Sequence, residues 1–276
     1  MEPGRDNLGI IAGGGRLPVQ LVEACKSSGR GHFVITFEES PNHEAILHAP
    51  HAIVRLGAVG DALKKLRDAD VTEVVLAGKV KRPTLARLKP DITATKLLGR
   101  LGKAFFGGDD ALLRALVGFL EQEGFHVISP QDILGSLIAN EGVLGRIQPS
   151  EADYADILTG LHAARELGRL DIGQAVIVED GHVLGLEAEE GTDSLIARCA
   201  GLKRKPRGGV LVKAKKPEQE DRVDLPAIGL ATIERVHEAG LNGIAIEAGS
   251  SIILDREELL ASADRLGLFV VGIRHD

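Results

Sequence analysis

The sequence has few of the side chains on which nucleic-acid binding depends. It contains no Trp, one Tyr and seven Phe, so few aromatic rings are available to stack on bases. Its 40 acidic residues outnumber its 33 basic ones and give a net charge of −7. Proteins that contact a phosphate backbone present a basic surface instead. These absences argue against a nucleic-acid partner and favour a small-molecule ligand.

Several catalytic and targeting patterns are absent too. The two cysteines, Cys25 and Cys199, fit no metal or disulfide spacing, and the nine histidines include no HxxxH pair. No Gly-x-Ser-x-Gly motif of a serine hydrolase occurs. No apolar run approaches the roughly 20 residues of a membrane-spanning helix, and the N-terminus lacks a signal-peptide pattern. We therefore expect a cytoplasmic protein.

The first half of the sequence alternates short β-rich runs with helical segments. We expect strands at residues 8–12, 32–37, 52–56, 74–77 and 125–128, and helices at residues 18–27, 61–68 and 109–124. Such alternation predicts a mostly parallel sheet covered on both faces. The predicted fold class is α/β, with a Rossmann-like N-terminal domain over residues 1–135.

The second half is predicted to be a mixed α/β domain. Residues 136–150 are rich in Gly, Asn, Gln and Pro and are the expected linker, so the second domain spans residues 151–276. Asp180-Gly181 between two β-rich runs predicts a tight hairpin. A helix is expected over residues 226–239.

Two glycine loops precede predicted helices. Gly13-Gly14-Gly15 follows the first strand, and a helix N-terminus after such a loop can bind a phosphate. The same glycines could instead form a tight turn without a ligand, and the dinucleotide pattern fails because Pro18 stands where a glycine is required. Gly108 and Asp109 offer a second loop, in which Asp109 is either a helix cap or part of a sugar- or phosphate-contacting site.

An acidic cluster lies where a predicted strand passes into a helix. It comprises Glu187, Glu189, Glu190 and Asp193, and alternation would place Glu187 and Glu189 on one face of the strand. Thr192 is the expected N-cap of the helix. Such a cluster could bind a hard divalent cation, or it could be a solvated edge.

A basic strand end is followed by two further aspartates. Lys213 and Lys215 alternate onto one face, where they could meet a pyrophosphate. Asp224 lies two residues before Pro226 and could cap a helix, or, with Asp221 nearby, hold a metal that activates water. Cations for substrate oxygens beside carboxylates for a metal are what phosphoryl transfer requires.

Residues 92–106 form a basic amphipathic segment. Leu98 and its apolar neighbours could pack on the protein's own core, or the segment could lie on an anionic bilayer. The second alternative predicts a peripheral contact with the cytoplasmic face of the inner membrane.

Seven segments, in order, resemble the UDP-2,3-diacylglucosamine pyrophosphatases of lipid A biosynthesis, of the type that is not calcineurin-like. The resemblance covers nearly the whole chain. The segments are LGIIAGGGRLP (8–18), LAGKVKRP (76–83), GDDALLR (108–114), GRLDIGQ (168–174), EAEEGTD (187–193), KAKKPEQEDRVDLPAIG (213–229) and LGLFVVGI (266–273).

The resemblance implies hydrolysis of UDP-2,3-diacylglucosamine to UMP and 2,3-diacylglucosamine 1-phosphate (lipid X), with water attacking the sugar-side phosphorus. It further implies a ligand cleft between the two domains, and a Mg²⁺ or Mn²⁺ ion with Asp224 central to the metal-dependent step. From the chemistry we add Lys213 as a second catalytic residue, and Asp221, Glu187 and Glu190 as further metal ligands. The expected substrate contacts are Gly13, Gly14, Gly15, Gly78, Gly108, Asp109, Gln174, Thr192, Asp193 and Lys215.

Two other functions stay open at this point. The chain could be a nucleotide-binding oxidoreductase that uses Gly13–Gly15, or a non-catalytic protein that binds a lipid or nucleotide sugar. Neither explains the segment from Lys213 to Pro226. The sequence leaves open whether the chain forms a homodimer.

Overall fold

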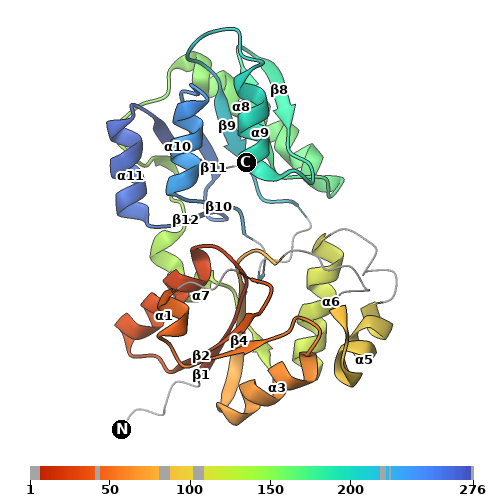
Figure 1. Ribbon diagram of the computed structural model, residues 1–276. Coiled ribbons are helices and arrows are strands. Elements are labelled where there is room, and N and C mark those ends of the chain that lie inside the picture. The colour runs from red at the N-terminus through yellow and green to blue at the C-terminus, as the bar shows by residue number, and fades with distance from the viewer. Residues whose placement is uncertain are drawn as a thin grey trace. The chain divides into compact units, whose positions relative to one another are not determined.

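The computed structural model describes residues 7–40, 44–80, 88–101, 109–217, 222–223 and 225–274 (Figure 1). The chain divides into two compact units. Unit 1 comprises Met1–Gly135 with Glu220–Asp224, and unit 2 comprises Ser136–Gln219 with Leu225–Asp276. The stretch 136–150, expected as a linker, carries a strand of the second sheet and belongs to unit 2.

Unit 1 is built on a parallel five-stranded sheet. Its elements, in chain order, are β1 (Asn7–Ala12), α1 (Leu17–Ser28), β2 (His32–Phe37), α2 (Glu44–Leu47), β3 (His51–Val54), α3 (Val59–Asp68), β4 (Val71–Ala77), α5 (Ile92–Leu101), α6 (Asp109–Gln122), β5 (His126–Val127) and α7 (Gln131–Leu134). The strand order is β3-β2-β1-β4-β5, with every pairing parallel. The predicted Rossmann-like parallel sheet is confirmed.

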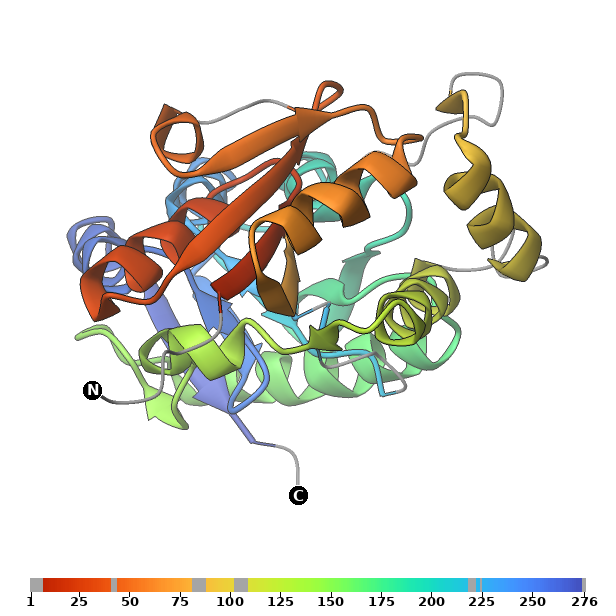
Figure 2. The ribbon, with the colours of Figure 1, turned by 90° about the horizontal axis from the view of Figure 1, so that it is seen from below.

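The strand order of unit 1 reverses between β1 and β4. In open parallel sheets, ligands gather beyond the carboxyl ends of the strands at this switch point. The loops that follow β1 and β4 therefore occupy the position at which a Rossmann-like domain binds its ligand. Helices α3, α5 and α6 pack leucines and phenylalanines on one face of the sheet, whereas α1 and α7 contact each other on the other side (Figure 2).

Unit 2 contains a mixed six-stranded sheet. Its elements are a short 3₁₀ turn (Gly135–Leu137), β6 (Gly142–Val143), α8 (Glu151–Arg169), β7 (Ala175–Glu179), β8 (His182–Leu186), α9 (Gly191–Ala200), β9 (Val210–Lys213), β10 (Ala227–Ile228), α10 (Leu230–Glu238), β11 (Gly243–Glu247), β12 (Ile252–Ile253), α11 (Arg256–Arg265) and β13 (Phe269–Ile273). The strand order is β6-β13-β11-β9-β7-β8. Strands β9, β11 and β13 are parallel, and β6, β7 and β8 pair in antiparallel fashion. The predicted mixed α/β architecture is confirmed.

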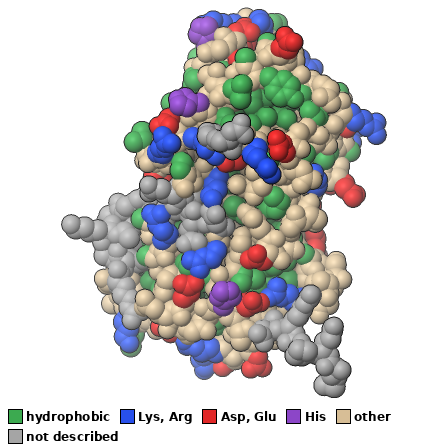
Figure 3. All heavy atoms as spheres, turned by 180° about the vertical axis from the view of Figure 1, so that it is seen from behind, with side chains coloured by type: hydrophobic (Ala, Val, Ile, Leu, Met, Phe, Trp, Pro, Cys, Tyr) green, Lys and Arg blue, Asp and Glu red, His purple; other side chains and the backbone are tan. Residues whose placement is uncertain are grey.

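The side chains of β7 alternate between two apolar layers of unit 2. Val176 and Val178 pack with α8, whereas Ala175 and Ile177 pack with α9, α10 and α11. This alternation buries the sheet on both faces. The outer surface of α8 keeps apolar side chains at the surface, with Tyr154 39% and Leu158 62% exposed; Figure 3 views this side of the molecule.

Two local predictions in unit 2 can be compared directly with the structure. Asp180 and Gly181 have φ of 50° and 75°, the left-handed values of a tight turn, and they join antiparallel β7 and β8 as predicted. The helix expected from residue 226 starts later, at Leu230. Ala227 and Ile228 form β10 instead, because they pair with Ile252 and Ile253 of β12.

No helix within the described residues is long and apolar enough to cross a bilayer. The amphipathic segment falls partly within α5, where Ala94 and Leu97 are buried and Leu98 packs against the core of unit 1. Ile92, at the start of α5, is 79% exposed. Phe105 and Phe106 lie outside the described residues.

Candidate functional site

The carboxyl edge of the sheet in unit 1 is built mainly from backbone. Gly13 N–H donates to Ala77 O at 2.8 Å, and Gly14 exchanges two hydrogen bonds with Lys79, at 2.9 and 2.8 Å. The loop after β1 is therefore joined to the loop after β4. The N–H groups of Gly13 and Gly14, two of the expected substrate contacts, are used in this junction.

Two glycines are required by that close approach. A Cβ on Gly13 would lie 2.7 Å from Lys79 O, and one on Gly78 would lie 2.6 Å from Gly14 O. Gly78 also has φ of 87°, which side chains disfavour. Gly15 differs, because it has φ of 106° and open space at its Cβ position. Among these loop residues, Gly15 keeps the access that a ligand needs.

The carboxyl edge of the sheet in unit 2 gathers charged and polar side chains. Lys213 ends β9, Gln174 precedes β7 beside it, and Glu187 follows β8. Thr192 lies in the first turn of α9 and reaches Glu187, and Lys215 lies two residues beyond β9. The structure thus brings five predicted site residues to one edge: Gln174, Glu187, Thr192, Lys213 and Lys215.

Lys213 is the buried cation of this edge. The residue is only 6% exposed, and its Nζ donates a hydrogen bond to Ala227 O at 3.2 Å. Lys215 is held through its backbone, since its N–H donates to Glu247 Oε2 at 2.8 Å. Glu247 in turn accepts a hydrogen bond from Arg165 at 2.6 Å. The strand end that carries both lysines is therefore held by a half-buried ion pair.

Glu187 is buried, and both of its carboxylate oxygens are occupied. Oε2 accepts from Gln174 N–H at 3.0 Å, and Oε1 accepts from Thr192 Oγ1 at 2.6 Å. Glu189 is exposed, because β8 ends at Leu186 and the expected alternation stops there. Thr192 does not cap α9; the helix begins at Gly191 without a side-chain cap, and the Thr192 hydroxyl is used by Glu187.

The remaining acidic residues of the cluster form separate ion pairs at the surface. Glu190 binds Arg198 at 2.8 Å, and this hydrogen bond lowers the pKa of the Glu190 carboxyl. Asp193 lies 3.3 Å from Arg235. Within the part of the chain that is described, no group of three or more His, Cys, Asp or Glu side chains is placed to hold a metal. Glu187 and Glu190 therefore belong to no such group among the described residues.

Four predicted residues cannot be placed with their side chains. Gly108, Asp221 and Asp224 lie outside the described residues, and the side chain of Asp109 does too, although α6 begins there as expected. Between the two aspartates, Arg222 binds Glu121 of α6 at 2.6 Å and Val223 packs against the core of unit 1. The segment before Leu225 thus returns to unit 1.

Sequence reasoning missed Glu247 and Arg165. Glu247 ends the buried strand β11, and a carboxylate directly after an apolar run was the available signal. Arg165 carried no signal, because it sits in a helix with many charged positions.

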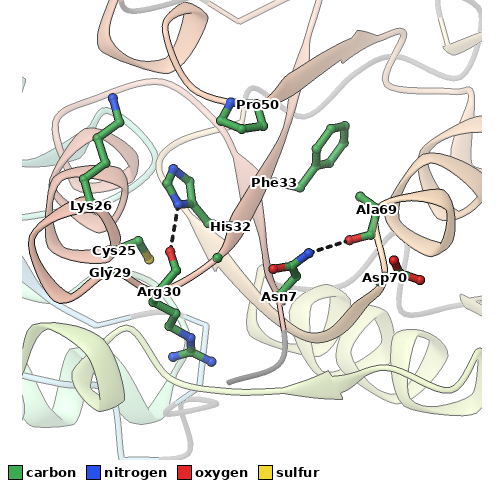
Figure 4. Close-up of a pocket in the computed structure, with 11 residues that line it drawn as sticks. Asn7, Cys25, Lys26, Gly29, Arg30, His32, Phe33, Pro50, Ala69 and Asp70 are labelled. Carbon is green, nitrogen blue, oxygen red and sulfur yellow. Dashed lines mark hydrogen bonds between the residues drawn. The ribbon is translucent and has the colours of Figure 1, made fainter. Parts of the chain in front are cut away.

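A separate pocket of about 600 Å³ lies at the amino edge of the sheet in unit 1 (Figure 4). His32 Nδ1 bonds to Arg30 O at 3.2 Å, while its Nε2 is buried without a partner among the described residues. Burial raises the pKa of the Cys25 thiol at its wall. The pocket contains none of the predicted site residues and lies at the edge opposite the glycine loops.

Comparison with known proteins gives matches along both units. The LpxI N-terminal domain matches residues 7–137, and the LpxI C-terminal domain matches residues 140–271. A curated protein of Caulobacter vibrioides, "UDP-2,3-diacylglucosamine pyrophosphatase LpxI", is 44% identical over 272 residues, which cover 96% of this chain and 97% of that protein.

Solved structures match only weakly. N5-carboxyaminoimidazole ribonucleotide synthetase from Thermotoga maritima is 15% identical, with 68% of this chain and 42% of that chain covered, at a TM-score of 0.26. CobK precorrin-6A reductase is 12% identical, with 99% and 89% covered, at a TM-score of 0.29. Likenesses at this level carry no conclusion about function.

Proposed function

Because this chain belongs to the LpxI family, we propose that it hydrolyses the diphosphate of UDP-2,3-diacylglucosamine to UMP and 2,3-diacylglucosamine 1-phosphate for lipid A synthesis. The observation that carries the proposal is the 44% identity to a curated pyrophosphatase across 96% of the chain. Identity spread over both units favours conservation of the whole enzyme rather than of one binding module.

The charged side chains at the carboxyl edge of the sheet in unit 2 support a phosphorylated substrate. Hydrolysis places developing negative charge on the phosphoryl oxygens, and preorganised cations in a poorly solvated site stabilise that charge. Lys213 is such a cation, because it is buried and held by Ala227 O. In the proposed reaction, water forms a bond to the sugar-side phosphorus, and the bond from that phosphorus to the bridging oxygen breaks. The leaving group is UMP.

The proposal includes a divalent cation, Mg²⁺ or Mn²⁺, with Asp224 as its first ligand and Asp221 as a second. A hard ion supplies charge neutralisation and a more acidic bound water to such reactions. Glu187 and Glu190 are left out of the ligand set, since each carboxylate oxygen of the first already accepts a hydrogen bond and the second is paired with Arg198. Removal of metal with EDTA should abolish UMP release, and added Mg²⁺ should restore it. Undiminished release from metal-free protein would refute the cation.

The reaction is tested with purified protein, the acylated nucleotide sugar and water enriched in ¹⁸O. Mass spectrometry should find the label in the phosphate of 2,3-diacylglucosamine 1-phosphate and not in UMP. Label in UMP would show attack on the other phosphorus. Retention of the substrate without any product would favour the non-catalytic binding protein.

Asp224→Asn should reduce UMP release by at least about 10³-fold, because an amide is neutral and a poor ligand for a hard cation. Asp68→Asn is the matched control, since Asp68 is exposed at the end of α3. Thermal melts should be unchanged for both variants. A folded Asp224→Asn protein with near-normal turnover would remove Asp224 from the mechanism.

The oxidoreductase alternative has little support from the glycine loop, because the Gly13 N–H group bonds to the last residue of β4 and the Gly14 N–H group to the loop after it. Titration with NADH fluorescence tests it, and saturable binding would revive it.

Peripheral membrane contact through α5 stays part of the proposal. Ile92 and Lys96 are the exposed apolar and basic side chains that a bilayer would meet, whereas Leu98 packs inward. Flotation with anionic liposomes should weaken in Ile92→Glu. Equal flotation of the variant and the unaltered protein would end this idea.

A further inference from the structure

Glu187 has the contacts of a structural clamp. Its two carboxylate oxygens join two segments that are distant in sequence: the residue before β7, through Gln174 N–H, and the first turn of α9, through the Thr192 hydroxyl. The backbone of Glu187 is fixed as well, because its N–H donates to Ala175 O at 2.9 Å. Each of these oxygens keeps a second lone pair. The access of a metal ion to them is limited by burial, because Glu187 is only 6% exposed.

The residue that this clamp fixes most closely is Gln174. Its N–H donates to Glu187 Oε2, and its carbonyl oxygen accepts from Ala214 N–H at 3.0 Å, so both backbone groups are held. The preceding Gly173 packs closely on the same residue, because a Cβ there would lie 2.2 Å from Glu187 O. Gln174 is therefore anchored directly beside the strand end of Lys213, whose neighbour in register is Ala175.

The side chain of Gln174 carries an unexplained polar atom. Its Oε1 is buried without a hydrogen-bond partner among the described residues, while the residue as a whole is only half-buried. An unpaired buried acceptor costs free energy, and a rotation of the amide toward a donor on a ligand would recover it. The hydroxyl and amide N–H groups of an acylated amino sugar are donors of this kind.

We propose that Gln174 is a specificity-determining residue that accepts a hydrogen bond from the acylated sugar, and that Glu187 is the positioning residue that holds Gln174 and Thr192 in place for it. This inference rests on the proposed function. It replaces the expected metal role of Glu187 with one that acts through two neighbouring residues.

The experiment compares Glu187→Gln, Glu187→Ala and Gln174→Leu, with the Mg²⁺ concentration for half-maximal rate, kcat and KM measured for each. Glutamine keeps an acceptor for Gln174 N–H and can face the Thr192 hydroxyl. Glu187→Gln should therefore stay within about tenfold of the unaltered kcat/KM, and its Mg²⁺ requirement should not move. Glu187→Ala should raise KM by about 10–100-fold, and Gln174→Leu should do so with kcat nearly unchanged.

Amide hydrogen exchange gives a readout that does not depend on activity. The Gln174 N–H should lose protection in Glu187→Ala and regain it in Glu187→Gln. A raised Mg²⁺ requirement in Glu187→Gln would restore the metal role and overturn the clamp. An unchanged KM in Gln174→Leu would overturn the sugar contact. If the unaltered protein releases no UMP, the proposed function fails instead, and the exchange experiment still decides the clamp.

Discussion

The carboxyl edges of the two sheets are held together by different groups. In unit 1 the edge consists of backbone, where glycines allow the loops after β1 and β4 to bond to each other directly. In unit 2 the edge consists of side chains, where buried Lys213, Glu187 and Glu247 are each held by a specific partner. A backbone edge depends on the absence of side chains, and a side-chain edge depends on matched charges and hydrogen bonds.

The largest effect is expected when the buried cation at the carboxyl edge of unit 2, Lys213, is removed. Lys213→Met keeps the length and apolar stem of the side chain but removes the charge, so we expect turnover to fall by about 10²–10³-fold. Lys216→Met is the control, because the Lys216 ammonium binds Asp171 at 2.6 Å. UMP release from both folded variants provides the measurement. A Lys213→Met protein as active as Lys216→Met would contradict the role of the buried ammonium.

The next largest effect is expected on stability, when a side chain is added at the carboxyl edge of unit 1. Gly13→Ala places a Cβ 2.7 Å from Lys79 O, and a backbone atom cannot yield as a flexible side chain can. We expect the free energy of unfolding to fall by about 2–3 kcal/mol. Gly118→Ala in α6 is the matched control, since no atom lies within 4 Å of its Cβ position. It should stabilise by up to about 1 kcal/mol through helix propensity. Urea unfolding of both variants measures the two changes in the free energy of unfolding. Changes of the same sign would contradict the prediction.

A smaller effect concerns the ion pair that supports the side-chain edge. Arg165→Met leaves Glu247, which is 8% exposed, without its 2.6 Å partner, and should cost about 1–3 kcal/mol. Arg169→Met on the same helix removes an exposed pair with Glu166 and should cost under about 0.5 kcal/mol. Thermal unfolding of the two variants should separate them. Equal losses would mean that burial adds nothing to the first pair.

The smallest effect is expected at the exposed pair of Glu190 and Arg198. The hydrogen bond from Arg198 lowers the pKa of Glu190 below its ordinary value of 4.5, so the charged form is favoured in the folded state. The stabilisation is present above that pH and is lost as the pH falls through the lowered pKa. Arg198→Ala should therefore reduce stability more at neutral pH than in strong acid, where only its 2.9 Å hydrogen bond to Leu186 O is left to lose. A loss that is the same at both pH values would assign the effect of Arg198 to packing.

The order of helices and strands in this protein could be predicted from the local sequence. The alternation of β-rich runs and helices gave the parallel sheet of unit 1, and Asp180-Gly181 gave the hairpin because both residues tolerate left-handed φ. The prediction was wrong where pairing partners came from far along the chain. Ala227 and Ile228 became a strand only because Ile252 and Ile253 lie beside them.

The candidate site divides in the same way. Residue type and order placed Gln174, Thr192 and Lys213 among the candidates, and chemistry indicated a phosphorylated ligand. Which of them serve structure could not be known, because that depends on partners 13, 14 and more residues away. Glu187 is an example. In the sequence it is one member of an acidic cluster, whereas in the fold its carboxylate accepts hydrogen bonds from Gln174 and Thr192.

By itself, the sequence determined the α/β class through its periodicity. The resemblance of seven local motifs to a known family indicated the family and its hydrolytic chemistry. Only the tertiary structure decided which glycines join two loops, which lysine is buried, and that the chain returns to unit 1 at Arg222 and Val223. Those properties arise from contacts between distant segments, and burial and hydrogen bonding exist only once the segments have met.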